Sequence, residues 1–226
     1  MKKINYRAII LYYMIAVACR YFTNRTDILK GLNNEYLRST LTGAGPAIGA
    51  VIVFALFNIK PIMSLKGNYK KILLPILIYY VLPVVLISIV LYYTKGTIPW
   101  MAVSSILIYG LLEEIGWRGF LYQELKGLPI VANILIVATL WFLWHLNFEF
   151  SASNVLFYAL LILGSWGIGK VADSTNSLIA VSAFHSLNNF FPKLDPTRIS
   201  ILSALLIIWI LSLIIRKKML AARAGR

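Results

Sequence analysis

Residues 104–123 read SSILIYGLLEEIGWRGFLYQ, an apolar run that holds two adjacent glutamates, Glu113 and Glu114, and an arginine, Arg118. A carboxylate in the hydrocarbon core of a bilayer costs about 3 kcal/mol on insertion scales. Charged residues are therefore rare in apolar segments of this length, and they mark functional sites when they occur. The run predicts a membrane helix that takes part in chemistry.

The only two histidines of the chain, His145 and His185, also lie within apolar segments. Ionisable side chains at such positions usually face the interior of a helical bundle rather than lipid. Together with the glutamate pair, the histidines predict an active site buried inside a bundle of membrane helices.

The composition of the whole chain is that of an integral membrane protein. Of its 226 residues, 60% are hydrophobic and 13% are charged, whereas about 25% are charged in ordinary soluble domains. A spanning helix needs about 20 mostly apolar residues. Such runs occupy roughly residues 4–22, 41–59, 72–93, 98–124, 130–148, 154–172, 177–191 and 199–216. We therefore predict an all-α fold, a polytopic membrane helical bundle of about eight transmembrane helices, with residues 1–226 as a single domain.

The net charge of +14 does not indicate binding of nucleic acid, because most of the basic residues lie in short segments beside the apolar runs. The main ones are Lys60, Lys66, Lys70, Lys71, Arg216, Lys217, Lys218, Arg223 and Arg226. This distribution follows the positive-inside rule and attracts anionic lipid. With eight spans, both termini and the 60–71 loop would share the cytoplasmic side of a bacterial plasma membrane. The basic residues of the 20–40 loop weaken this predicted orientation.

A turn at Pro129 predicts where the first histidine lies relative to the glutamates. Glu113 is sixteen residues before this proline, and His145 is sixteen residues after it. In an antiparallel hairpin, equal separations from the turn give equal depth, at about 1.5 Å rise per residue. Glu113 and His145 should therefore be able to face each other, and His185, midway along its own run, can reach the same level.

The two glutamates are predicted to differ in role. Glu114 and Arg118 are four residues apart, so they share a helix face and can form an ion pair. Glu113 is rotated by about 100° and is free to act elsewhere. A glutamate in such a site can serve as a general base on water, and His145 could hold or polarise the same water.

His185 and Asn189 are also four residues apart and share a helix face. Both side chains can donate hydrogen bonds, which suits the stabilisation of a developing oxyanion, whereas Asn188 should point about 100° away. Each polar residue taken alone also has a structural interpretation, as an ion pair or as a hydrogen bond between helices. We favour the chemical interpretation because all of them converge on three predicted spans.

Three motifs in this order carry a resemblance to a known family. They are Glu113-Glu114-x-x-x-Arg118, Trp141-x-x-x-His145 and His185-x-x-x-Asn189. The set resembles the CAAX protease and bacteriocin-processing family of intramembrane proteases, also called the CPBP or Abi family, which includes the type II CAAX prenyl endopeptidases. The resemblance covers a motif-bearing core of about residues 98–191. It implies an intramembrane endopeptidase, that is, a hydrolase acting on peptide bonds.

The resemblance also assigns the residues of the motifs to catalytic roles. It implies activation of the attacking water by Glu113 and His145, an oxyanion hole of His185 and Asn189, and organisation of the site by Glu114 and Arg118. One position departs from the family pattern, because the family usually has phenylalanine where this chain has Trp141. An aromatic wall is retained there, so we expect activity to be retained as well.

We predict no cofactor. A Zn²⁺ ion held by Glu113, His145 and His185 is the alternative, since a carboxylate and two imidazoles are reasonable zinc ligands. We favour the metal-free interpretation because the sequence contains neither His-Glu-x-x-His nor another closely spaced histidine pair.

The leading functional prediction is an endopeptidase that cuts a membrane-associated peptide or protein substrate near the bilayer surface. Peptide maturation or bacteriocin self-immunity would be its biological role. A non-catalytic membrane immunity or scaffolding protein of the same family is the alternative. A transporter or proton pathway could also use intramembrane glutamate and histidine, but the sequence lacks the repeat symmetry common in transporters.

Overall fold

The structure is a computed structural model that describes residues 4–191, 196, 198–209 and 211. The described residues form helices and no strand, so the predicted all-α fold is confirmed. The first half contains α1 (Tyr6–Arg25), α2 (Glu35–Thr42), α3 (Ala44–Leu56), α4 (Tyr69–Ile76), the π-helical segment η1 (Leu77–Val81) and α5 (Leu82–Lys95). The second half contains α6 (Trp100–Gly116), the π-helical segment η2 (Trp117–Leu121), α7 (Tyr122–Glu124), the 3₁₀ turn η3 (Leu125–Gly127), α8 (Ile130–Trp144), α9 (Ala152–Thr175) and α10 (Leu178–Phe190). A further apolar helix covers Arg198–Trp209.

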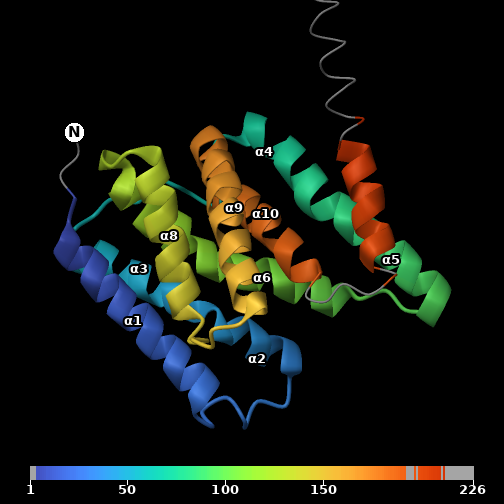
Figure 1. The fold of residues 1–226 in the computed structure, drawn as a ribbon, viewed down its shortest axis with the longest axis horizontal. Helices are drawn as coiled ribbons and strands as arrows, with labels where there is room; N and C mark the ends of the chain where they lie inside the picture. Colours follow the sequence, from blue (N-terminus) through green and yellow to red (C-terminus); the bar gives the residue numbers. More distant parts are fainter. Residues whose placement is uncertain (1–3, 192–195, 197, 210, 212–226) are drawn as a thin grey trace, which may run out of the picture.

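Helix α6 crosses the middle of the bundle (Figure 1). It packs against α3 and α10, while α9 packs against α8 and α10. Helices α1 and α3 lie on one side of α6, and α4 and α5 lie at the far edge (Figure 1). Side chains on the inner faces of α6, α8 and α10 are therefore directed into one shared interior.

The predicted apolar runs coincide with helices, but the predicted eight spans are not confirmed. Among the described residues, two helices are long and apolar enough to cross a membrane, Tyr69–Lys95 and Ala152–Thr175, and a third if α2 and α3, bent by 47°, form one span. Helices α8 and α10 have 15 and 13 residues, so they rise only about 22 Å and 20 Å. This is short of the roughly 30 Å hydrocarbon core of a bilayer. The end of the predicted 199–216 run lies outside the described residues.

The surface of the longest helix faces outward. Only 11% of the most apolar window of Tyr69–Lys95 is buried inside the protein. Large apolar side chains such as Leu73, Leu74 and Ile89 are exposed along it. A continuous apolar surface of this size marks contact with lipid or with another protein, and together with α9 it indicates an integral membrane protein.

Two glycines let α3 approach α1 closely. A Cβ at Gly45 would lie 2.7 Å from the Ala16 carbonyl oxygen, and one at Gly49 would lie 2.8 Å from the Tyr12 carbonyl oxygen. Small residues permit such backbone approach between membrane helices. The contact holds the Tyr12 side chain fully buried in the interior, with its ring 5.8 Å from the ring of Trp117.

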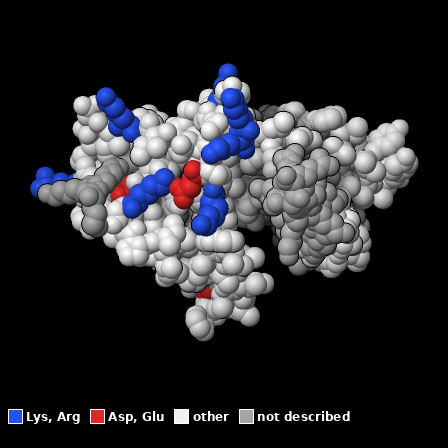
Figure 2. All heavy atoms as spheres, turned by 90° about the horizontal axis from the view of Figure 1, so that it is seen from above, with Lys and Arg blue, Asp and Glu red and all other residues white. Residues whose placement is uncertain are grey.

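One end of the bundle is closed by polar contacts. The Asn5 backbone nitrogen donates to Glu124 at 3.0 Å, and Lys126 pairs with Asp173 at 2.9 Å. The 60–71 loop is held at the same end by hydrogen bonds to the C-terminal residues of α9. Figure 2 shows this face, on which lysine and arginine side chains outnumber the acidic ones. The basic residues predicted at 216–226 lie outside the described part of the chain.

The opposite end is where α1 finishes. Arg25 donates to the Leu146 carbonyl oxygen at 3.1 Å, which joins the end of α1 to the loop after α8. Because α1 begins at the end that holds Glu124 and finishes at the end that holds Leu146, the two ends lie on opposite sides of the bundle.

Candidate active site

The glutamate pair lies where α6 changes from an α-helix to the π-helical segment η2. π-helical turns within longer helices occur frequently at functional sites. Glu113, Glu114, Trp117 and Arg118 are all buried, none more than 1% exposed. The sequence therefore places two carboxylates and a guanidinium in the interior, where each needs a partner.

Glu114 has two partners on one oxygen, a guanidinium and an imidazole. Arg118 Nη1 donates to Glu114 Oε1 at 2.8 Å, and His185 Nδ1 lies 2.7 Å from the same oxygen. Arg118 Nη2 also lies 3.4 Å from Ser165 Oγ on α9. The predicted pairing of Glu114 with Arg118 is present. The contact with His185 further connects α6 to α10, so the first and third motifs meet through Glu114.

Glu113 is held by neutral donors instead. Its Oε2 accepts hydrogen bonds from the indole nitrogens of Trp141, at 2.7 Å, and Trp117, at 3.3 Å. Two indole N–H groups fix the orientation of the carboxylate without neutralising its charge. The two adjacent glutamates therefore have different environments, as the sequence predicted.

Trp141 lies next to residues of all three motifs. Its indole donates to Glu113, and the guanidinium of Arg118 stacks over its ring at 4.5 Å. Its ring lies 5.2 Å from the ring of His185 and 6.4 Å from that of His145. Trp141 and His145 are thus neighbours, as residues one helical turn apart can be. Its hydrogen bond to Glu113 was not predicted, because the sequence does not show which way an indole N–H points across a helix interface.

The tautomer of His145 follows from its backbone contact. Its Nδ1 lies 2.8 Å from the carbonyl oxygen of Trp141, which can only accept, so Nδ1 carries the proton. The Nε2 lone pair of the neutral ring is then available to a water. The ring is packed against Phe157, with 4.8 Å between ring centroids, and against Trp144, at 5.1 Å.

Four of the six predicted site residues line one cavity of about 920 Å³. They are Glu113, His145, His185 and Asn189. Glu114 and Arg118 do not line the cavity. Glu114 contacts His185, which does line it, and Arg118 contacts Glu114. The equal depth predicted for Glu113 and His145 is consistent with their sharing this space, and His185 reaches the same level.

Asn188 differs from its prediction. It was expected to point about 100° away from Asn189, but both residues line the cavity. The cavity extends along more than one face of α10, so neighbouring side chains can both reach it. Two further residues that the sequence did not single out, Tyr109 and Arg20, also line it. Tyr109 lies close enough to both Glu113 and Arg20 for their charges to act on its hydroxyl.

The alternative zinc site would bring Glu113, His145 and His185 together around one ion. Among the described residues, no three side chains of the His, Cys, Asp or Glu type lie close enough together to hold a metal ion. The chemistry below is therefore derived from the side chains alone.

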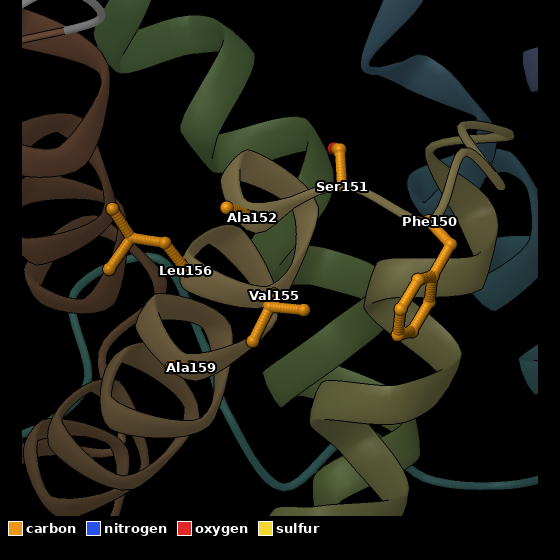
Figure 3. A pocket seen from close by; sticks show the side chains of 6 residues that line it. All are labelled: Phe150, Ser151, Ala152, Val155, Leu156 and Ala159. Atoms are coloured by element: carbon orange, nitrogen blue, oxygen red, sulfur yellow. The ribbon is translucent and has the colours of Figure 1, made fainter.

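A second, apolar hollow lies at the start of α9, and Figure 3 shows the residues that line it. Phe150 lies on one side of this hollow of about 570 Å³ and Val155 on the other, with Phe150 fully exposed. Leu156 lines both this hollow and the main cavity. The first turns of α9 therefore separate the main cavity from an apolar outer surface.

Comparison with known proteins agrees with this geometry. Residues 95–191 match a family model described as type II CAAX prenyl endopeptidase, Rce1-like. This segment belongs to the CAAX protease family. The match runs from the end of α5 through α10 and contains all six predicted site residues, so the family expected from the three motifs is confirmed. Since the CAAX protease family is one of peptidases, a hydrolase activity is supported for this chain. No curated protein and no solved structure matches the chain.

Proposed function

We propose that the chain is an intramembrane endopeptidase in which Glu113 activates a water molecule to attack a peptide bond near the membrane surface. The observation that carries the proposal is the convergence of Glu113, His145, His185 and Asn189 on one cavity, within the segment that matches the CAAX protease family. The arrangement supplies a base, an acceptor that can position water, and hydrogen-bond donors in one cavity.

Glu113 is the base. Its Oε2 is held by Trp141 and Trp117, and the Tyr109 hydroxyl also lies near the carboxylate, so we assign the attacking water to Oε1. His145 Nε2 accepts a hydrogen bond from the same water, because Nδ1 carries the ring proton. Glu113 removes one proton from the water as its oxygen bonds to the substrate carbonyl carbon. A positioned base of this kind accelerates such a step by about 10²- to 10⁴-fold.

His185 and Asn189 face the developing oxyanion. The Asn189 amide donates as it stands. His185 directs Nδ1–H at Glu114, so its Nε2 donates a hydrogen bond only when the ring carries both protons. In that state the charges of Arg118 and His185 balance those of the two glutamates. Preorganised donors in a site without bulk water are among the largest contributions to catalysis.

The intermediate then collapses with cleavage of the carbon–nitrogen bond. The proton held by Glu113 passes to the leaving amine nitrogen, and the carbonyl carbon keeps the oxygen that came from water. The products are a new amine and a new carboxyl group, which releases the second proton of the water to the amine or to solvent as it becomes a carboxylate, and Glu113 returns to its ionised state. The cycle is balanced without a covalent enzyme intermediate.

The test is cleavage of a peptide library by the purified, full-length protein in detergent micelles, with products identified by mass spectrometry. The wild-type protein should cut a subset of the peptides at defined bonds, and Glu113→Gln should cut none at a comparable rate. Glu149→Gln is the matched control, since Glu149 is exposed in the loop before α9 and outside the cavity. Equal cleavage by the wild type and Glu113→Gln would show that Glu113 is not the base. Binding of peptides without cleavage would favour a non-catalytic immunity or scaffolding protein.

We propose peptide maturation or bacteriocin self-immunity as the biological role. The family match supports the endopeptidase chemistry, and it does not address immunity. A cell producing the relevant peptide should lose maturation or immunity when Glu113→Gln replaces the wild type. Retention of the phenotype at a normal protein level would contradict a proteolytic role.

A further inference from the structure

Tyr109 lines the main cavity one helical turn before Glu113 on α6, so the two side chains share a helix face. We propose that Tyr109 is a further catalytic residue, which passes the proton collected by Glu113 to the leaving nitrogen of the substrate. The inference rests on the proposed endopeptidase function and deepens its last step. It gives the leaving group a donor of its own, beside the base and the donors for the oxyanion.

The ring of Tyr109 is held in place by residues of other helices. It lies against Gly43, at the junction of α2 and α3, where a Cβ would come within 2.7 Å of two of its ring carbons. It also meets the ring of His185 on α10, with 6.2 Å between centroids and 73° between planes. Residue 43 therefore has to lack a side chain for the phenol to keep this position in the wall of the cavity.

The hydroxyl of Tyr109 lies within hydrogen-bonding reach of the Glu113 carboxylate and of the Arg20 guanidinium. A guanidinium can only donate and an ionised carboxylate can only accept, so the resting hydroxyl accepts from Arg20 and donates to Glu113. Once Glu113 has taken a proton from the water, it can donate to the phenol oxygen in turn. The phenol hydrogen is then free to turn into the cavity, toward a substrate nitrogen.

Glu113 is poorly placed to deliver the proton by itself. Its Oε2 is fixed by the indole N–H groups of Trp141 and Trp117, so the carboxyl group cannot turn without breaking both contacts. His145 directs its Nδ1 proton at a backbone carbonyl oxygen and offers the cavity only an acceptor. A neighbouring hydroxyl that both accepts and donates, as that of Tyr109 does, overcomes this restriction.

Other polar groups that line the cavity have different partners. Thr42 Oγ1 and Ser105 Oγ donate to carbonyl oxygens of their own helices, at 2.6 Å and 2.8 Å. In the proposed mechanism His185 and Asn189 are directed at the oxyanion. Tyr109 therefore combines what a relay needs, a position beside the base and a proton that it can exchange.

The proposed step is balanced. As the carbon–nitrogen bond breaks, its electron pair stays on the nitrogen, which takes the phenol proton of Tyr109. The phenol oxygen takes the proton held by Glu113 at the same time. Tyr109 thus ends as a neutral hydroxyl and Glu113 ends ionised, and no charge accumulates on the relay.

The test compares two substrates that differ only in the leaving atom. A peptide that the wild-type protein cuts is made with its amide and as a thioester in which sulfur replaces the scissile N–H. An amide nitrogen has to be protonated to leave, whereas sulfur leaves as a thiolate, since a thiol has a pKa of about 8.5. Tyr109→Phe should lower kcat for the amide by about 100-fold or more, as is typical for loss of a positioned acid. Its kcat for the thioester should stay close to that of the wild type.

Tyr80→Phe is the matched control, because the Tyr80 hydroxyl donates to the Val103 carbonyl oxygen at 2.9 Å and does not line the cavity. Its ratio of amide to thioester kcat should equal that of the wild type. Gly43→Ala keeps the phenol but displaces its ring, so it should lower this ratio as Tyr109→Phe does. Gly31→Ala is the control for that variant, since a Cβ at residue 31 meets nothing within 4 Å.

Two results with Tyr109→Phe would overturn the relay. An equal loss on both substrates would mean that the phenol only supports the site, and no loss on either would mean that the reaction does not use it. Glu113→Gln separates these results from a failure of the proposed function. If it abolishes cleavage of both substrates, the endopeptidase mechanism stands whatever Tyr109→Phe shows. If it cuts both at the wild-type rate, or if the wild type cuts neither, the proposed function fails and the relay falls with it.

Discussion

Trp141 on α8 donates a hydrogen bond of 2.7 Å from its indole nitrogen to Glu113 Oε2 on α6. The carboxylate that is proposed to activate water is thus oriented by a residue on the other arm of the hairpin. Trp117, one turn further along the same helical segment as Glu113, supplies a second and longer contact. The orientation of the base depends on a donor that the usual phenylalanine of the resembled motif would lack.

Trp141→Phe removes this donor while keeping an aromatic ring in the wall. We expect kcat to fall by about 10-fold or more, because a hydrogen bond to a charged group contributes roughly 1.5–3 kcal/mol. KM should change less, since the ring remains in place. Steady-state kinetics on a cleaved peptide provide the measurement. Trp100→Phe, at the exposed start of α6, is the control, and an unchanged kcat in Trp141→Phe would show that the donor is dispensable.

Glu114→Gln should damage the fold as well as the activity. The substitution leaves Arg118 and His185 without their shared carboxylate in a fully buried site. Loss of one partner from a buried ion pair typically destabilises a protein by about 3–5 kcal/mol. Thermal unfolding in detergent should show a clear decrease in Tm.

Glu113→Gln provides the contrast for that measurement. Its carboxylate contacts neutral indole groups, and a glutamine oxygen can still accept from them. Its Tm should stay close to that of the wild type. Equal decreases in Tm for the two variants would contradict the division of roles between the two glutamates.

Metal dependence separates the glutamate-base mechanism from the zinc alternative. The described side chains form no three-ligand cluster, so we expect chelators to leave the peptidase activity unchanged. Elemental analysis of the purified, active protein should find less than stoichiometric zinc. Stoichiometric Zn²⁺ that is lost together with activity, and restored with it, would favour a metal mechanism.

Residues at the two ends of the bundle should be accessible to reagents from opposite sides of the membrane. Asn24 lines the polar pocket at the end where α1 finishes, and Lys66 lies in the basic loop at the other end. Single cysteines at these positions, in a Cys19→Ala background, can be labelled in intact cells with an impermeant reagent. If the 60–71 loop is cytoplasmic, Asn24→Cys should react and Lys66→Cys should react only after lysis. Labelling of both or of neither in intact cells would contradict this topology.

Much of the site could be predicted because its residues follow helical spacing. The i, i+4 relation of Glu114 and Arg118, and the equal separation of Glu113 and His145 from Pro129, need only a helix and a turn. The ordering of the helices was predictable for the same reason. The number of spans stays unconfirmed, because α8 and α10, although apolar, rise by less than the thickness of the hydrocarbon core.

The contacts that the sequence did not predict are those between side chains on different helices. The contact between Trp141 and Glu113 depends on the rotation of α8 relative to α6, which no local pattern encodes. The sequence predicts Arg20 at the edge of the 20–40 loop, but α1 continues to Arg25 and Arg20 lines the cavity. The available signal in the sequence was a basic residue, Arg20, at the end of an apolar run.

The central claim is that Glu113 is the base that activates water. The most direct measurement is kcat/KM of Glu113→Gln relative to the wild type, on a peptide that the wild type cuts, with both proteins shown to unfold at the same temperature. The account predicts a loss of about 10²- to 10⁴-fold, with Glu149→Gln unchanged. A Glu113→Gln protein that is folded and cuts the peptide at the wild-type rate would contradict it.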